Sequence, residues 1–268
     1  METQPLSIPA VFEEFHSLPD FQKTYRTAVE VAHLDDHPAL ASRPLRVVDF
    51  AGGAGLLYPY LAEYFKGVEN SFSYTNIDLD ADRLSQSPGR RIHGDLSFLT
   101  LAEFPPNPDC IFSLFSAPVT PTVTTKAYKQ FIKLAEVFQV ARTLGNDGRY
   151  IVAGQYSEGF IDWLQRHFDE YQTGITGYSH ERLTLSPKSA ATLLDFDLNT
   201  LPNNKRRADN TSRKEDILNY QQVSVVGFKR DRPAQDINKL NKNLRLLQAI
   251  ILAEGRIPRR LDALHRWI

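Results

Sequence analysis

The sequence predicts an α/β protein with a doubly wound, mostly parallel, seven-stranded sheet whose final strand is antiparallel. Two observations carry this prediction. From residue 45 onward, short apolar segments alternate with amphipathic stretches, which is the pattern of parallel strands joined by crossover helices. The segment DCIFSLF, residues 109–115, is almost wholly apolar, as expected of a strand buried on both faces. A chain of 268 residues, 42% of them hydrophobic, is long enough to bury a sizeable core.

The individual elements follow from the same patterns. Apolar runs predict strands over residues 45–50, 71–80, 90–95, 109–115, 148–156, 181–186 and 220–230. Amphipathic stretches predict helices over residues 55–65, 82–86, 124–145 and 159–168. Pro59 is tolerated in the first of these helices because it lies in the opening turns, and Gly145 ends the third.

The chain is expected to divide into three parts. Residues 1–42 form an N-terminal helical cap, residues 43–232 form the α/β domain, and residues 233–268 form a C-terminal helical extension. Within the domain, residues 199–216 are polar and charged, and we expect a loop or a disordered insertion there. The extension carries an apolar stripe at helical spacing, which packs on the domain or forms a homodimer face. Its members are Leu240, Leu244, Leu247 and Ile251.

Composition excludes several classes of function. The formal net charge is −1, so the molecule as a whole is not built to bind nucleic acid or an anionic membrane. The chain has one cysteine, Cys110, which we expect to be a small buried hydrophobe. The absence of a signal-like start or a long apolar segment predicts a soluble, cytoplasmic protein. HLDDH, residues 33–37, lacks a third ligand at a recognisable spacing, so we expect no metal site.

The segment DFAGGAG, residues 49–55, places three glycines directly after the first predicted strand. Glycine has no Cβ and adopts positive φ readily, so such a turn lets backbone N–H groups face a ligand. Nucleotides bind in this way at the carboxyl ends of parallel strands. Asp78 follows Gly55 by 23 residues (78 − 55), close to the spacing of an acid that binds ribose hydroxyls. The sequence therefore predicts a nucleotide-type site.

A dinucleotide fingerprint fits this turn poorly. If Gly53 and Gly55 are the first two glycines of G-x-G-x-x-G, the third falls on Tyr58, where close helix–strand packing requires Gly or Ala. Asp49 also precedes the turn, and an acid there suits a ligand with cationic groups better than a pyrophosphate. A nicotinamide-dependent oxidoreductase is therefore disfavoured.

These residues resemble the class I S-adenosylmethionine-dependent methyltransferases, a Rossmann-like superfamily. The first motif of that family, an acid followed by x-G-x-G-x-G, falls on residues 49–55. Gly53 and Gly55 occupy its last two glycine positions, and Ala51 replaces the first. The order and spacing of the later strands also match, so the resemblance spans residues 45–230. It implies methyl transfer from S-adenosylmethionine.

The resemblance also implies a set of cofactor contacts. The second-strand acid of the family falls on Asp78, which binds the ribose, and the third acidic position falls on Asp95, at the adenine edge with Leu96. Leu79 flanks the adenine, Ser113 lines the methyl-transfer side, and the first acid with the turn holds the methionine part. The implied cofactor-binding residues are Asp49, Ala51, Gly52, Gly53, Gly55, Asp78, Leu79, Asp95, Leu96 and Ser113.

The methyl acceptor decides whether a base is needed, because only some acceptors must lose a proton. The candidate bases are Tyr156 and Glu158, after the fifth predicted strand, and His180 and Glu181, before the next strand, with His180 preferred of the last two. The fourth strand continues as SLFSAP, residues 113–118. It lacks the Asp/Asn-Pro-Pro-Tyr/Phe ending of the enzymes that methylate amino groups of nucleic acids. We therefore expect a small-molecule acceptor first.

Two alternatives stay open at this point. A basic loop, residues 205–214, is suited to an RNA or protein methyltransferase that recognises its target through charge. A non-catalytic module that keeps the fold and works through its C-terminal helix, as a partner or dimer surface, fits the same motifs.

Overall fold

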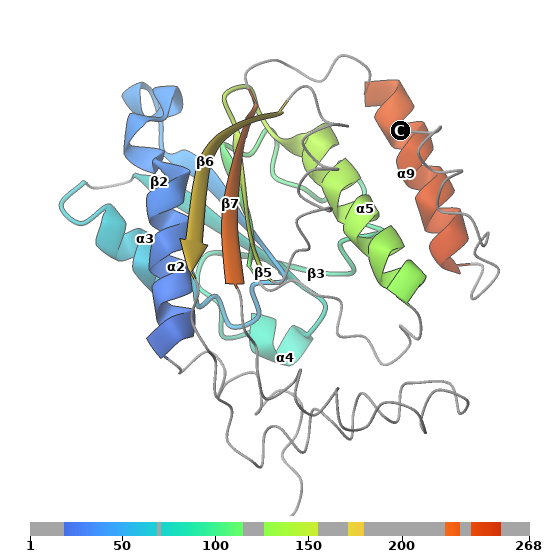
Figure 1. The fold of residues 1–268 in the computed structure, drawn as a ribbon, viewed down its shortest axis with the longest axis horizontal. Helices are drawn as coiled ribbons and strands as arrows, with labels where there is room; N and C mark the ends of the chain where they lie inside the picture. Colours follow the sequence, from blue (N-terminus) through green and yellow to red (C-terminus); the bar gives the residue numbers. More distant parts are fainter. Residues whose placement is uncertain are drawn as a thin grey trace, which may run out of the picture.

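The computed structural model of the chain describes residues 19–68, 71–114, 126–154, 171–179, 223–230 and 237–252. Its sheet has seven strands in the spatial order β3-β2-β1-β4-β5-β7-β6 (Figure 1). The strands are β1 (Leu45–Phe50), β2 (Phe72–Asp78), β3 (Arg90–His93), β4 (Cys110–Leu114), β5 (Arg149–Gly154), β6 (Tyr171–Ser179) and β7 (Val223–Arg230).

The sheet is doubly wound, as the sequence predicts. Strands β1 to β5 are parallel, and β7 is antiparallel to both of its neighbours. From β1 the chain runs outward through β2 to β3, and it then returns to the other side of β1 with β4 and β5. The strand order therefore reverses between β1 and β4. Open α/β sheets bind their ligands at such a reversal, beyond the carboxyl ends of the strands.

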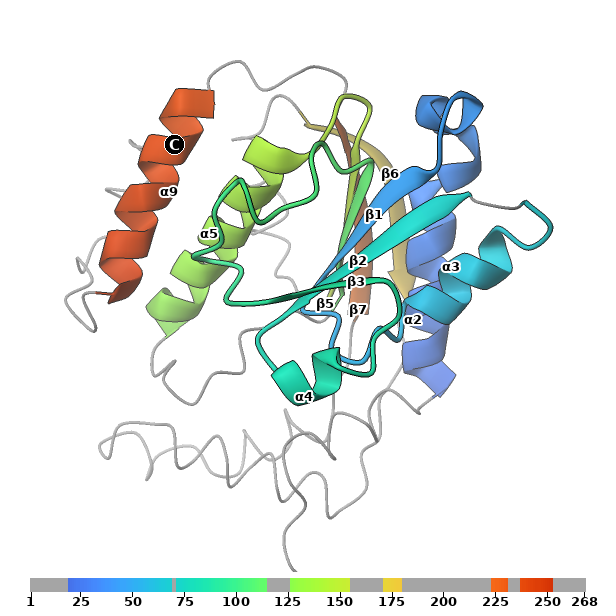
Figure 2. The same cartoon turned by 180° about the vertical axis from the view of Figure 1, so that it is seen from behind.

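Helices cover both faces of this Rossmann-like sheet (Figures 1 and 2). On one face lie α2 (Pro19–Ala32) and α3 (Tyr58–Tyr64), and on the other lies α5 (Lys126–Thr143) with α9 (Ile237–Leu252) on its outer side. The single-turn helix α4 (Ala81–Leu84) follows β2 at the carboxyl edge. Two 3-10 helices, η1 (Leu34–Asp36) and η2 (Pro38–Ala41), lead from α2 to β1.

The alternation of side chains along β1 and β4 divides the core into two clusters, one on each face. The cluster on the α2 and α3 side includes Val47 and Phe112, and the cluster on the α5 side includes Val48 and Ile111. The side chains of α2 belong to the first cluster. The helical part of the N-terminal segment therefore shares one core with the sheet.

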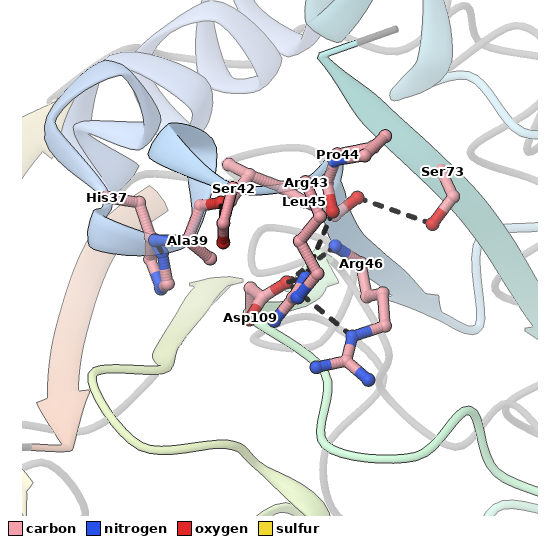
Figure 3. Close-up of polar contacts among 9 residues, drawn as sticks. All are labelled: His37, Ala39, Ser42, Arg43, Pro44, Leu45, Arg46, Ser73 and Asp109. Atoms are coloured by element: carbon pink, nitrogen blue, oxygen red, sulfur yellow. Dashed lines mark hydrogen bonds and ion pairs between the residues drawn. The ribbon is translucent and has the colours of Figure 1, made fainter.

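An ion-pair network fixes the amino edge of the sheet, opposite the glycine turn (Figure 3). The carboxylate of Asp109 accepts hydrogen bonds from Nη1 and Nη2 of Arg43 over 2.5 and 2.8 Å, and from the backbone N–H of Arg46 over 2.7 Å. Nearby, the buried guanidinium of Arg149 at the start of β5 donates to the carbonyls of Ala32 and His33. These contacts attach the end of α2 and the start of β1 to the same edge.

The later part of the sheet differs from the sequence expectation in one element. Strand β6 was not predicted, because its sequence YQTGITGYS contains two glycines and few apolar residues, as an edge strand permits. The strand predicted over 181–186, the helix predicted over 159–168 and the insertion 199–216 lie outside the described residues.

Leu244 and Leu247 of α9 are buried against the α5 side, so the apolar stripe packs on the domain. No described helix is long and apolar enough to cross a membrane.

Candidate functional site

The glycine turn after β1 is a run of left-handed backbone positions. Ala51, Gly53 and Gly55 have φ values of 55°, 52° and 79°. The backbone N–H of Ala51 donates to the carbonyl of Ile77 over 2.8 Å, which continues the β1–β2 ladder into the turn. Because a left-handed residue with a Cβ costs about 1–2 kcal/mol, Ala51 is a strained position held by its neighbours.

The space beside these glycines is filled by other side chains of the protein. A Cβ on Gly52 would lie 2.6 Å from Oδ1 of Asn76 and 2.5 Å from Cγ of Asp49. A Cβ on Gly53 would lie 2.7 Å from Nη2 of Arg83, and one on Gly55 would lie 2.8 Å from Cδ of Pro88. The sequence predicts that these glycines expose backbone N–H groups to a ligand. The structure adds a second reason, since they also leave room for charged and polar side chains that converge on the turn.

Asp78, at the end of β2, ties the turn to α4. Its Oδ2 accepts the N–H of Gly53 over 2.7 Å, and its Oδ1 accepts the N–H of Asp80 over 2.8 Å. Asp80 in turn caps α4, because its side chain accepts the N–H groups of Asp82 and Arg83. An ionised carboxylate has about four acceptor positions. The half-buried Asp78 therefore keeps capacity for a ligand diol while it holds the turn.

Asp49, at the other side of the turn, is buried, with 2% of its surface exposed. The hydroxyl of Tyr74 donates to its Oδ2 over 2.5 Å. Burial raises the pKa of Asp49 to about 7; the hydrogen bond from Tyr74 opposes this rise, and the nearby charge of Asp78 adds to it. Asp49 is therefore a carboxyl group that titrates near neutral pH.

Asn76 lies opposite Asp49 in the β1–β2 pair and projects from the same face of β2 as Asp78. Its Nδ2 donates to the carbonyl of Gly53 and to Oγ of Ser87, each over 2.8 Å. Its Oδ1 is buried, and no described residue donates a hydrogen bond to it. A buried acceptor without a donor is costly. Oδ1 of Asn76 and the carboxyl group of Asp49 both lie beside Gly52. Together these two acceptors are suited to a hydrogen-bond donor of a ligand.

The residues implied at the adenine lie further along the same edge. Leu79 has an exposed side chain, and Asp95 is exposed, with its Oδ1 accepting the N–H of Ser97 over 2.8 Å. Leu96 is partly buried against the α5-side core. Its carbonyl accepts Nε2 of Gln139 over 2.7 Å. The structure thus places an exposed leucine and an exposed acid near the ends of β2 and β3.

The loop that carries Asp95 is held by the helices of the opposite face. Nη2 of Arg142 and Nε2 of Gln139, both on α5, donate to the carbonyl of Leu99 over 2.6 and 3.0 Å. Nε2 of Gln248 on α9 donates to the carbonyl of Ser97 over 2.7 Å. The C-terminal helix therefore fixes the loop after β3 from outside α5.

Ser113 is fully buried near the end of β4. Its hydroxyl donates to Oε1 of Glu136 on α5, which also accepts the hydroxyl of Tyr150 over 2.8 Å. The side chain of Ser113 therefore faces the α5 side of the sheet. Asp49 and Asn76 face the α2 and α3 side, so the structure does not bring Ser113 together with them.

Sequence reasoning missed three residues that lie beside the turn: Tyr74, Asn76 and Arg83. Strand alternation was the available signal for two of them, because Tyr74 and Asn76 precede Asp78 at steps of two and share its face. Arg83 carries no such signal, since α4 brings it to the turn through the tertiary fold. The proposed bases Tyr156, Glu158 and His180 lie outside the described residues.

Two other sequence expectations concern groups away from the turn. Cys110 is fully buried in β4, which confirms the expected hydrophobic role. His33 is exposed, whereas His37 is buried and its Nδ1 accepts the N–H of Ala39 over 3.1 Å. Within the part of the chain that the structure describes, no cluster of three or more His, Cys, Asp or Glu residues is placed to hold a metal ion.

No protein-family model and no curated protein sequence matches the chain. Among solved structures, it is similar to N-methyltransferase NodS from Bradyrhizobium japonicum WM9, with 8% identity, a TM-score of 0.46 and coverage of 81% of this chain and 99% of that one. It is also similar to the plantazolicin methyltransferase BpumL, solved in complex with SAH, with 8% identity, a TM-score of 0.49 and coverage of 84% and 90%. Similarities at this level do not assign a function, which has to be argued from the site.

Proposed function

We propose that the chain is an S-adenosylmethionine-dependent methyltransferase with a small-molecule acceptor. The observation that carries this proposal is the position of Asp78. It joins the glycine turn to α4 at the reversal of strand order, where its free acceptor capacity faces the carboxyl edge. A ribose diol bonded to such a carboxylate is held by two charge-assisted hydrogen bonds.

The donors and acceptors around the turn fit the other parts of this cofactor. The acceptors of Asp49 and Asn76 beside Gly52 suit an ammonium group. The exposed Leu79 and the exposed Asp95 suit the face and the amino edge of an adenine. S-adenosylmethionine supplies an activated methyl group on a sulfonium centre. The protein is then required to align donor and acceptor and to exclude water.

The proposal also names the class of the methyl acceptor, a small molecule. The fourth strand lacks the ending that grips exocyclic amines of nucleic acids, which supports a small molecule. Tyr156, Glu158 and His180 are the proposed bases for an acceptor that must lose a proton. The basic loop over 205–214 keeps an RNA or protein acceptor as the alternative, with a steep dependence of binding on salt.

Calorimetric titration with S-adenosylmethionine and S-adenosylhomocysteine tests the cofactor. We expect micromolar binding to the wild type and at least a tenfold loss in Asp78→Asn, whose amide keeps the size of the side chain but loses the charge. The matched control is Asp82→Asn, at an exposed position in α4, which should bind as the wild type does. Equal binding by wild type and Asp78→Asn would contradict the proposed site.

Methyl transfer is tested separately from binding. A labelled methyl donor is incubated with the protein and with small-molecule, RNA and protein fractions in turn. Transfer into the small-molecule fraction supports the proposal, and transfer into RNA or protein supports the alternative acceptor. Tight binding of the cofactor without transfer to any fraction would favour the non-catalytic module.

A further inference from the structure

We propose that Arg83 binds the carboxylate of the ligand's amino-acid group, so that Arg83 and Asp49 together make the glycine turn selective for a zwitterion. This inference rests on the proposed function and deepens it. It assigns a specificity-determining role to a residue that the sequence motifs do not include.

The guanidinium of Arg83 lies flat against the turn. Its Nη2, Cζ and Nε lie 2.7, 2.8 and 3.2 Å from the place that a Cβ of Gly53 would occupy. A guanidinium has five N–H donors in a fixed planar arrangement and no acceptor. It binds carboxylates through two parallel hydrogen bonds. The side chain that covers Gly53 is therefore the type best suited to a carboxylate.

The backbone of Arg83 is fixed by the same contacts that fix Asp78. The N–H of Arg83 donates to Oδ1 of Asp80 over 3.1 Å, and the N–H of Asp80 donates to Asp78. Asp78 also accepts the N–H of Gly53. The turn, the acid and the start of α4 thus form one hydrogen-bonded unit. A ligand bound to Asp78 has Arg83 at a defined place.

Opposite charges flank two consecutive glycines. The carboxyl group of Asp49 lies at Gly52, and the guanidinium of Arg83 lies at Gly53. Consecutive Cα atoms are about 3.8 Å apart, a scale suited to an ammonium and a carboxylate carried by one carbon. The arrangement is complementary in sign to an α-amino acid, with its ammonium toward Asp49 and its carboxylate toward Arg83.

The buried Tyr25 of α2 lies near both charged groups. Burial raises the pKa of this phenol, the charge of Asp49 raises it further, and the charge of Arg83 lowers it. The ring of Tyr25 stacks on that of Tyr60 with centroids 5.5 Å apart. This buried, stacked ring therefore lies on the α2 side of the two charged groups.

The test compares two ligands that differ in one group. S-adenosylmethionine carries the ammonium and the carboxylate, and decarboxylated S-adenosylmethionine carries the ammonium alone. Both are titrated by calorimetry into wild type, Arg83→Met, Arg83→Lys and the control Arg90→Met. Arg90 lies at the amino end of β3, where its Nη2 donates to the carbonyl of Glu103, so its loss removes the same charge without removing a group that lies at Gly52 or Gly53.

We expect wild type to prefer S-adenosylmethionine at least tenfold. Arg83→Met should bind it 10- to 100-fold more weakly and bind the decarboxylated form within twofold of wild type. Arg83→Lys should fall between, because an ammonium keeps the charge without the paired hydrogen bonds. Arg90→Met should match wild type.

Three results would overturn the inference. Equal weakening of both ligands in Arg83→Met and Arg83→Lys would mean that Arg83 shapes the turn without contacting the carboxylate. Unchanged preference in both variants would mean that it does not contact the ligand. Binding of neither ligand by wild type would remove the proposed function itself, and that outcome is distinguished because the Asp78→Asn substitution would then also be without effect.

Discussion

The hydroxyl of Tyr74 points at the carboxyl group of Asp49 across the β1–β2 pair, 2.5 Å away, and both groups are buried. The two side chains share a face because they project from neighbouring strands in register, with Val47 opposite Tyr74 and Asp49 opposite Asn76. Burial and the charge of Asp49 both raise the pKa of Tyr74 well above its usual value. The phenol therefore acts only as a donor, and the protonation of the pair is decided at Asp49.

The raised pKa of Asp49 predicts a pH dependence of stability. Between about pH 4, the unfolded pKa, and pH 7, the folded protein holds a proton that the unfolded chain has lost. This group therefore makes the free energy of unfolding fall as pH rises through that window. Asp49→Asn removes the effect and should stabilise the protein at pH 8, by about 4 kcal/mol at most. Urea unfolding at pH 5 and pH 8 measures it. Asp82→Asn, an exposed control, should show no difference.

The same group predicts that cofactor affinity depends on pH. Below pH 7 Asp49 is protonated and cannot pair with an ammonium, so the affinity for S-adenosylmethionine should rise between pH 6 and pH 8. The rise is limited to about tenfold per pH unit by one proton. Calorimetry at pH 6, 7 and 8 measures it. An affinity in Asp49→Asn that followed the wild-type profile would assign the dependence to another group.

Gly53→Ala and Gly67→Ala separate backbone strain from loss of space. Both glycines have positive φ, at 52° and 89°, so each substitution should cost about 1 kcal/mol of stability. A Cβ at Gly67 would meet no atom within 4 Å, whereas one at Gly53 would meet the guanidinium of Arg83. Only Gly53→Ala should therefore also lose cofactor affinity, by tenfold or more. Equal affinities of the two variants would show that the space at Gly53 does not matter for binding.

Substitution of Asp109 should destabilise the protein and leave the proposed cofactor site intact. Burial alone would raise its pKa, but hydrogen bonds from Arg43 and the N–H of Arg46, with the charge of Arg43, outweigh burial and hold the pKa below its usual value. Its contribution is present above about pH 4 and is lost as pH falls through the folded pKa.

Asp109→Ala should lower the free energy of unfolding at pH 7 by about 2–3 kcal/mol. This is less than the ~3–5 kcal/mol of a fully buried pair, because Arg43 is 36% exposed. Urea unfolding measures the loss, and calorimetry should show unchanged cofactor affinity. The network of Figure 3 lies at the amino edge of the sheet, so a variant that stays folded but binds weakly would contradict this separation.

Much of the fold follows from local pattern because the central strands β1, β4 and β5 carry largely apolar runs. Strand β4, with all five residues buried, is the clearest case. Strand β6 was not predicted because it lies at the edge of the sheet, where a strand does not need a continuous apolar run. The acids of the site were also accessible from sequence, since each lies at or just after the end of a strand. Arg83 was not, because its position depends on how α4 packs against the turn.

Gln248 contacts Ser97 across 151 residues of chain, which has a consequence for synthesis. A ribosome adds about 5–20 residues per second, so the loop after β3 exists for several seconds before α9 is made. The glycine turn, Asp78 and α4 are contiguous in sequence and can assemble early. The loop of Asp95 gains the hydrogen bond from Gln248 only after α9 has been synthesised. A nascent chain that stops before residue 237 therefore contains the glycine turn, Asp78 and α4. It lacks the α9 contact that supports the loop of Asp95.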